Sequence, residues 1–333
     1  MRKLAASLTL GTSLLLALPA QAGTVTIYTP FEEWAVKLIQ EELDNRGMDI
    51  QLEFYRSASV ELNMLFEQEQ KAGLARVDYV MIDPDYLEIY KKQGYLLKHP
   101  IANADEFPAA AIDPDGHWFA VEYSPMFMVY NTNLIKGDDV PTSWRDMTDP
   151  RFKDLVGMAD PRTSTAVQFP ITYWTKTLAE TIGEPEYGWS FVEDLAKNNP
   201  RLSSGHTQLT DMVITGEIAI APLMMGPVLN PMEAGEPLGI ALPKEGAPMQ
   251  VTGAAVAANA PHMADAVKLH EFFASEEGQR LIYEKVGKLV AHPGVKQTLP
   301  DGTRMDGFKG TRLVISDEQR AENLDRIVDI FGL

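Results

Sequence analysis

The fold of this chain is decided by one stretch, Gly157-Met158-Ala159-Asp160-Pro161-Arg162-Thr163-Ser164-Thr165-Ala166. Its first residues are apolar and predict a strand, the Asp-Pro pair predicts a turn, and the run from Ala166 to Leu178 predicts a helix. The first amides of a helix lack internal partners and lie at the positive end of its dipole. Thr163, Ser164 and Thr165 add hydroxyl donors beside those amides. The stretch therefore predicts an anion site at a helix start.

A plainer interpretation of the same turn is that its hydroxyls only cap the helix. Thr165 and Gln168 have the spacing of a capping box, which favours a helix start at this point. Pro170 argues for a kink or a later start, because proline has no amide hydrogen and clashes inside a helix. Taken alone, the turn is compatible with both ligand binding and capping.

The beginning of the chain has the pattern of a secretory signal. Arg2 and Lys3 precede a short apolar run, and Ala20-Gln21-Ala22 has small residues where a signal peptidase cleaves. We predict that residues 1–22 are removed and that the mature protein starts at Gly23 in the periplasm. The sequence contains 0 cysteines, so neither a lipid anchor on cysteine nor a disulfide framework is expected.

The composition is typical of a globular protein with a core large enough for two lobes. Of the 333 residues, 45% are hydrophobic and 23% are charged, and the formal net charge is −18. Such an acidic surface disfavours nucleic acid and anionic membranes as partners. A small anion is still compatible, since backbone amides act at contact while surface carboxylates are screened beyond about 8–10 Å at physiological salt.

Strands and helices alternate regularly over the first hundred residues. Apolar runs predict strands at 25–28, 49–54 and 77–82, each followed by a polar loop and an amphipathic helix. This alternation builds a parallel sheet covered by helices on both faces, and ligands of such sheets bind outside the carboxyl ends of the strands. Three loops stand at those ends: Thr29-Pro30-Phe31, Arg56-Ser57-Ala58-Ser59 and Asp83-Pro84-Asp85.

A long apolar strand from Trp118 to Tyr130 interrupts this alternation. Pro125 in its middle indicates a bend or an edge position, as expected of a strand that crosses between lobes. Downstream we predict helices at Tyr187 to Lys197 and at His206 to Ile214, strands at Glu217 to Ala221 and at Val251 to Ala258, a capping box of Ser143 with Asp146, and a final amphipathic helix at Asp317 to Phe331.

Several blocks of sequence occur in the order found in one family. They are Val25-Thr-Ile-Tyr28, Gln93-Gly-Tyr-Leu-Leu97, Met128-Val-Tyr-Asn-Thr132, Pro141-Thr-Ser-Trp-Arg-Asp146 with Pro150-Arg-Phe-Lys-Asp-Leu155, Gly216-Glu-Ile-Ala-Ile220 and Ala274-Ser-Glu-Glu-Gly-Gln279. The chain resembles the periplasmic solute-binding proteins of ABC importers, of the type II two-lobed class, in the branch with ferric-iron, hexose-phosphate and phosphonate binders. The resemblance implies an α/β fold of two lobes, each a mostly parallel sheet flanked by helices, which close on a ligand.

The resemblance and the crossing strand together give an expected division of the chain. Residues 1–22 form the signal peptide, 23–121 the first part of lobe 1, 122–225 lobe 2, 226–275 the return to lobe 1, and 276–333 the C-terminal helices that pack across the lobes. The resemblance also implies a monomeric transport receptor whose closed form is recognised by a membrane permease. No phosphate-binding Gly-x-x-x-x-Gly-Lys, Gly-x-Ser-x-Gly or paired metal histidines occur, so we expect no enzyme and no cofactor.

The resemblance leaves the ligand open. Iron-binding members hold the metal with adjacent tyrosines near the second crossing, where this chain has Pro222-Leu-Met-Met-Gly226, and soft thioethers suit ferric iron poorly. We therefore predict no metal site. Hydroxyl-bearing helix starts favour an oxyanion, and the predicted ligand is a small organophosphate or phosphonate. A ferric-iron or polyamine binder of the same class, and a carboxylate or polyol binder, are the alternatives. The predicted ligand-binding residues are Thr29, Pro30, Phe31, Arg56, Ser57, Ser59, Asp83, Thr163, Ser164, Thr165, Gly205, His206, Thr207 and Met225.

Overall fold

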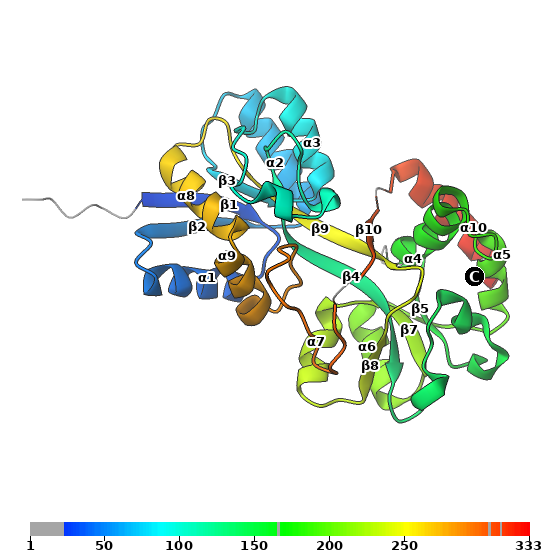
Figure 1. Cartoon of the computed structure of the whole chain (residues 1–333). Helices are drawn as coiled ribbons and strands as arrows, with labels where there is room; N and C mark the ends of the chain where they lie inside the picture. Colours follow the sequence, from blue (N-terminus) through cyan, green and yellow to red (C-terminus); the bar gives the residue numbers. More distant parts are fainter. Residues whose placement is uncertain (1–22, 165–166, 306–307, 314) are drawn as a thin grey trace, which may run out of the picture.

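The computed structural model of the chain describes residues 23–164, 167–305, 308–313 and 315–333 (Figure 1). The predicted signal peptide and two residues of the anion turn, Thr165 and Ala166, lie outside this range. The strands are β1 Gly23–Thr29, β2 Ile50–Arg56, β3 Tyr79–Ile82, β4 Phe119–Asn131, β5 Gly157–Ala159, β6 Arg201–Ser203, β7 Ile220–Met224, β8 Leu238–Ala241, β9 Ala247–Val256 and β10 Gly310–Arg312. The helices are α1 Glu33–Asn45, α2 Ser59–Lys71, α3 Pro84–Gln93, α4 Gln168–Thr172, α5 Trp189–Ala196, α6 His206–Thr215, α7 Gly226–Glu233, α8 Met263–Ala274, α9 Glu276–Leu281 and α10 Asp317–Phe331.

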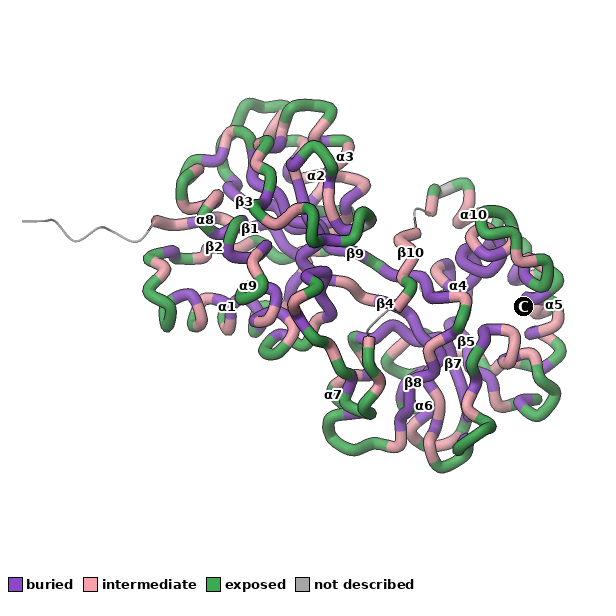
Figure 2. The backbone as a smooth tube through the Cα atoms, viewed as in Figure 1, coloured by how far each residue is buried: buried purple, intermediate pink, exposed green. Residues whose placement is uncertain are grey.

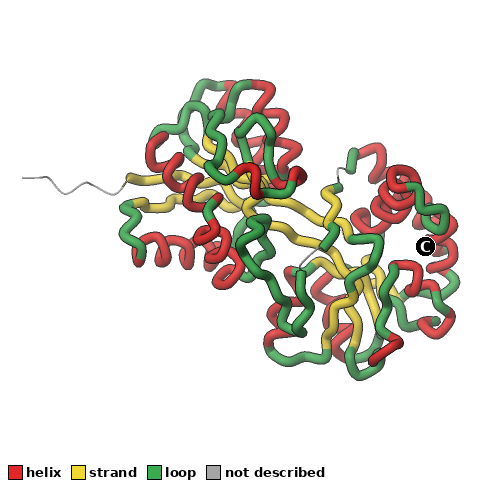
Figure 3. Tube along the Cα trace, in the orientation of Figure 1, coloured by secondary structure: helices red, strands yellow, loops and turns green. Residues whose placement is uncertain are grey.

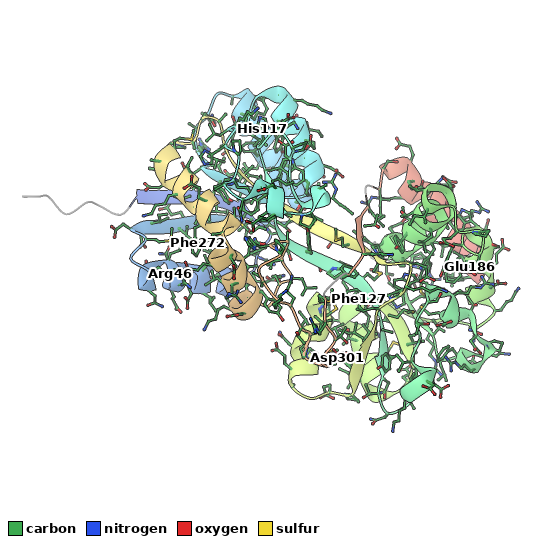
Figure 4. The ribbon with its side chains drawn as sticks, in the orientation of Figure 1. Arg46, His117, Phe127, Glu186, Phe272 and Asp301 are labelled. Atoms are coloured by element: carbon green, nitrogen blue, oxygen red, sulfur yellow. The ribbon has the colours of Figure 1, made fainter. Side chains whose placement is uncertain are left out.

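Two hydrophobic cores divide the chain into two lobes (Figure 2). The buried side chains of the first core come from 25–121 and 249–295, and those of the second mainly from 126–247. Phe272 belongs to the first core and Phe127 to the second (Figure 4). Helices lie on the outside of both lobes, and strands run through the middle of the molecule from one lobe to the other (Figure 3). The predicted two-lobed α/β fold is confirmed.

One strand, β4, serves both lobes. Its first half, from Phe119 to Pro125, pairs antiparallel with β9, and its second half, from Met126 to Asn131, pairs with β7 and β8. Pro125 stands where the partners change, at the bend that the sequence predicts. The strand order is β2-β1-β3-β9-β4-β7, with β1, β2 and β3 parallel to one another. β4 and β9 are thus the two crossing strands that join the lobes.

The predicted lobe boundaries differ from the structure after residue 225. α7 and β8 were expected in the return to lobe 1, but their buried residues Val228, Met232 and Ile240 belong to the second core. The return begins only at β9, since β9 is the strand that pairs with β3. The C-terminal helices also separate: Leu281 of α9 lies in the first core and Ile327 of α10 in the second.

One strand of lobe 2 is shifted from its predicted position, since β7 runs from Ile220 to Met224 and includes Pro222, whereas the prediction was Glu217 to Ala221. The predicted capping box of Thr165 with Gln168 includes a residue that lies outside the described range. The Gln168 side chain itself is buried, donates to the Arg320 carbonyl at 3.3 Å and accepts from Asn323 at 2.9 Å. α4 begins at Gln168 without a side-chain cap, so Pro170 lies in the first turn, where an amide hydrogen is not needed.

The capping box of Ser143 with Asp146 and the final helix from Asp317 to Phe331 are confirmed. Across the described ranges, no helix combines the length and the apolar character that a membrane crossing requires.

Candidate ligand-binding site

The carboxyl ends of the parallel strands bring the first group of candidate residues to one edge of lobe 1. β1 and β2 are paired in register, with Thr29 opposite Arg56, and the Ser57 amide donates to the Thr29 carbonyl at 3.4 Å. β3 lies on the other side of β1 and ends at Asp83. The loops after all three strands therefore meet at the edge that faces lobe 2 (Figure 1).

The start of α2 supplies unpartnered donors at this edge. α2 begins at Ser59, and because its N-cap is Ala58, no side chain caps its first amides. Neither the hydroxyls of Ser57 and Ser59 nor the exposed guanidinium of Arg56 has a hydrogen-bond or ion-pair partner among the residues described. Free amides at a helix start beside an arginine suit an anion.

The other lobe 1 candidates have structural roles. Thr29 is 1% exposed, and its hydroxyl accepts from the Phe31 amide at 3.1 Å, which fixes the turn after β1. Phe31 is itself in the first core, and Pro30 between them is half-buried. Asp83 caps α3 by accepting from the Asp85 amide at 2.9 Å, and burial raises the pKa of its carboxyl.

A second group of loops meets at one edge of lobe 2. β5 and β6 pair in parallel, β7 lies beside β5 through a parallel bridge of Val156 with Ile220, and all three strands end on the same side. The loop after β5 carries Thr163 and Ser164, whose amides donate to the Asp160 carbonyl at 3.2 and 2.9 Å. The loop after β6 carries Gly205, the N-cap of α6, and His206 and Thr207 are the first two residues of that helix.

Arg162 of the anion turn is not free for a ligand. Its Nε and Nη2 donate to the two carboxylate oxygens of Asp160 at 2.9 and 2.7 Å. This bidentate pair holds the pKa of the Asp160 carboxyl below its usual range. The charge of Arg162 is thus neutralised within its own turn.

α6 presents donors in the same way as α2. Gly205 is its N-cap, so no side chain caps the helix, and Thr207 is exposed. Both ring nitrogens of His206 are buried without a hydrogen-bond partner. Burial lowers the pKa of His206 to about 4, so the ring is neutral near pH 7 and offers one donor and one acceptor rather than a charge.

A cavity of about 690 Å³ spans the two lobes beside these edges. Glu32 and Trp34 line it from lobe 1, Gly226 and neighbouring residues of α7 from lobe 2, and 283–288 complete the wall. Met225, one of the predicted ligand-binding residues, is 2% exposed and belongs to the second core. The 283–288 segment was missed in the sequence, where it reads only as the end of a helix.

Two glutamates, Glu32 in the cavity wall and Glu122 on β4, each have a buried carboxylate oxygen without a hydrogen bond to a described residue. The Oε2 atom of Glu32 is buried without a hydrogen bond, and the Lys288 ammonium lies 3.7 Å from it. Glu122 on β4 is 7% exposed and accepts from Thr252 on β9 at 2.6 Å, while its Oε2 has no partner. Burial raises the pKa of Glu122. The described part of the chain contains no group of three or more His, Asp or Glu side chains suited to hold a metal ion.

Known proteins resemble this chain in sequence. The family model described as bacterial extracellular solute-binding protein matches residues 77–307. The probable ABC transporter periplasmic-binding protein y4fP of Sinorhizobium fredii is 27% identical over 183 residues, 53% of this chain and 49% of that protein. Spermidine/putrescine-binding periplasmic protein 1 of Haemophilus influenzae is 26% identical over 174 residues, 52% of this chain and 47% of that protein. The chain spans about half the length of these curated relatives.

A solved structure with the same fold is the periplasmic binding protein AfuA from Actinobacillus pleuropneumoniae with fructose-6-phosphate bound. The TM-score is 0.61, the identity is 19%, and the match covers 93% of this chain and 99% of AfuA. At this identity the likeness concerns the fold alone.

Proposed function

The chain belongs to the bacterial extracellular solute-binding proteins, and from this premise we propose that it is the periplasmic solute-binding component of an ABC importer. It captures a solute between its lobes and delivers it to a membrane permease. Members of this family bind solutes and are not enzymes. The periplasmic location, reached by cleavage after Ala22, is part of the proposal and rests on the signal pattern.

The proposed solute is a small organic phosphate or phosphonate. The observation that carries this proposal is the pair of uncapped helix starts, α2 in lobe 1 and α6 in lobe 2, with the unpartnered guanidinium of Arg56 beside the first. Four charge-assisted hydrogen bonds at a net ~1.5–3 kcal/mol each supply roughly 6–12 kcal/mol before ordering costs. Micromolar binding needs about 8 kcal/mol, so these donors suffice.

A solute with an amine is the second candidate, and two buried glutamates favour it. Glu32 and Glu122 each have a buried carboxylate oxygen without a hydrogen bond to a described residue. An ammonium group of the solute would compete with the Lys288 ammonium, which lies 3.7 Å from the Glu32 oxygen, in surroundings that penalise an unpaired charge. A polyamine, as named for the Haemophilus relative, has this chemistry.

Titration calorimetry distinguishes the two candidates. The purified protein is titrated with fructose 6-phosphate, glycerol 3-phosphate, inorganic phosphate, fructose and spermidine. We expect binding of at least one phosphate compound and none of fructose. Spermidine binding alone would favour the second candidate, and equal binding of fructose and fructose 6-phosphate would reject the phosphate proposal.

A pair of arginine variants locates the site. Arg56→Gln should weaken phosphate binding about ten- to hundredfold, since it removes one charge-assisted contact. Arg76→Gln is the matched control, because Arg76 is also an exposed lobe 1 arginine but precedes β3, at the opposite edge of the sheet. Equal affinities for the two variants would place the anion away from α2.

A further inference from the structure

The strand β10 brings an arginine to the crossing between the lobes. Gly310–Arg312 pairs in parallel with Ala247–Met249 of β9, and β10 lies between the lobes in Figure 1. The Arg312 side chain is 23% exposed. No motif in the sequence marks this residue.

Only one side of the Arg312 guanidinium has a partner. Its Nη2 donates to Oδ1 of Asp85 at 2.5 Å, and Asp85 stands in the first turn of α3, at the lobe 1 edge described above. Its Nη1 is buried and has no hydrogen-bond partner among the residues that the structure describes. A guanidinium has five N–H donors and no acceptor, so an unpartnered Nη1 that is shielded from water calls for an oxygen acceptor.

Both acidic and basic side chains lie around Arg312, and burial disfavours the charged form of the acidic ones. Asp83 and Asp85 face it from lobe 1, and burial raises the pKa of both carboxyls, so both hold their charge less readily than usual. Arg312 counteracts this rise for both, and Arg320 of α10 does so for Asp83. Asp83 and Glu88 also act on Asp85, and each raises the pKa of its carboxyl further. Burial thus disfavours the ionised form of both carboxyls, and Arg312 partly offsets this effect.

We propose that Arg312 binds the anionic group of the solute through its free Nη1 edge while Asp85 holds the guanidinium in place through Nη2. Arginine is suited to this because its planar fork binds phosphate or carboxylate oxygens and stays charged. The inference rests on the proposed function and adds an anion-binding residue from the C-terminal segment. Asp85 then has two effects: it holds the guanidinium in place, and its carboxylate competes with the solute anion for Arg312.

Two variants that break the same ion pair distinguish direct binding from a simple link between lobes. Titration calorimetry with fructose 6-phosphate and inorganic phosphate should show affinity about ten- to hundredfold weaker for Arg312→Gln. Asp85→Asn should bind as tightly as the wild type or more tightly, because it removes the competing carboxylate and leaves Arg312 charged. Arg312→Lys, which keeps the charge with fewer donors, should lie in between and serves if Arg312→Gln does not fold.

Each other outcome decides against the inference. Tighter binding by both Arg312→Gln and Asp85→Asn would show that the pair only holds the lobes in their empty arrangement. Equal losses in both would show that the ion pair, and not the free Nη1, matters. Wild-type affinity of Arg312→Gln would overturn the inference while leaving the proposed function intact. Failure of the wild type to bind either phosphate would reject the proposed function, and this inference with it.

Discussion

Gln279 connects three segments of lobe 1. We expect its replacement to destabilise that lobe more than the replacement of a surface residue of similar size. The side chain is 0% exposed. Its Nε2 donates to the carbonyls of Val121 and Phe273 at 3.2 and 3.0 Å, and its Oε1 accepts from the amides of Ala291 and His292 at 3.0 and 3.3 Å. These four backbone groups belong to β4, to α8 and to the segment after α9.

The magnitude follows from these four bonds. Gln279→Leu removes all of them, at a net of about 1 kcal/mol each. Burial of the apolar leucine side chain stabilises the folded state by about 1 kcal/mol. We therefore expect a loss of about 3 kcal/mol in the free energy of unfolding, by urea denaturation followed by circular dichroism.

Two further variants test the reasoning. At neutral pH, Gln279→Glu buries a charge beside the carbonyls of Val121 and Phe273, so its loss should be at least as large as that of Gln279→Leu and should diminish as the pH falls. Gln250→Leu is the matched control, because Gln250 is exposed on β9 and its side chain forms no hydrogen bond with a described residue. A loss below about 1 kcal/mol for Gln279→Leu would refute the hydrogen-bond account.

Further outcomes are expected. Ser143→Ala should cost about 1–2 kcal/mol in thermal or urea unfolding, since the Ser143 hydroxyl caps a helical turn and donates to Glu245 at 2.5 Å; an unchanged midpoint would contradict this. Stability should fall as the pH drops from about 6.5 towards 4, because the unfolded state binds protons that the buried His206 and His270 do not, at up to about 1.4 kcal/mol per pH unit for each histidine. His206→Gln should reduce that dependence, and an unaltered slope would assign it to other groups. Saturating ligand should reduce the radius of gyration in small-angle scattering, and an unchanged radius would reject lobe closure. Titration with ferric citrate should produce no visible tyrosinate-to-iron band, since methionines stand where the iron binders have tyrosines; such a band would reopen iron as the ligand.

The sequence by itself determined what depends on near neighbours along the chain. The alternation of strands and helices in lobe 1 follows from hydrophobic periodicity. The final helix α10 and the capping box of Ser143 with Asp146 depend on residues three or four apart. The bend at Pro125 follows from the missing amide hydrogen of proline. The order of several such blocks sufficed to predict two lobes and their crossing.

Only the tertiary structure decided which of two equivalent local roles a polar side chain has. Gln168 has the spacing of a capping residue, but its buried side chain bonds Asn323, 155 positions away. No motif surrounds Arg312 in the sequence, yet its guanidinium meets Asp85 across 227 positions. Hydrogen bonds and burial depend on distances in space, and for residues this far apart those distances are set by how the lobes pack and not by the sequence around either residue.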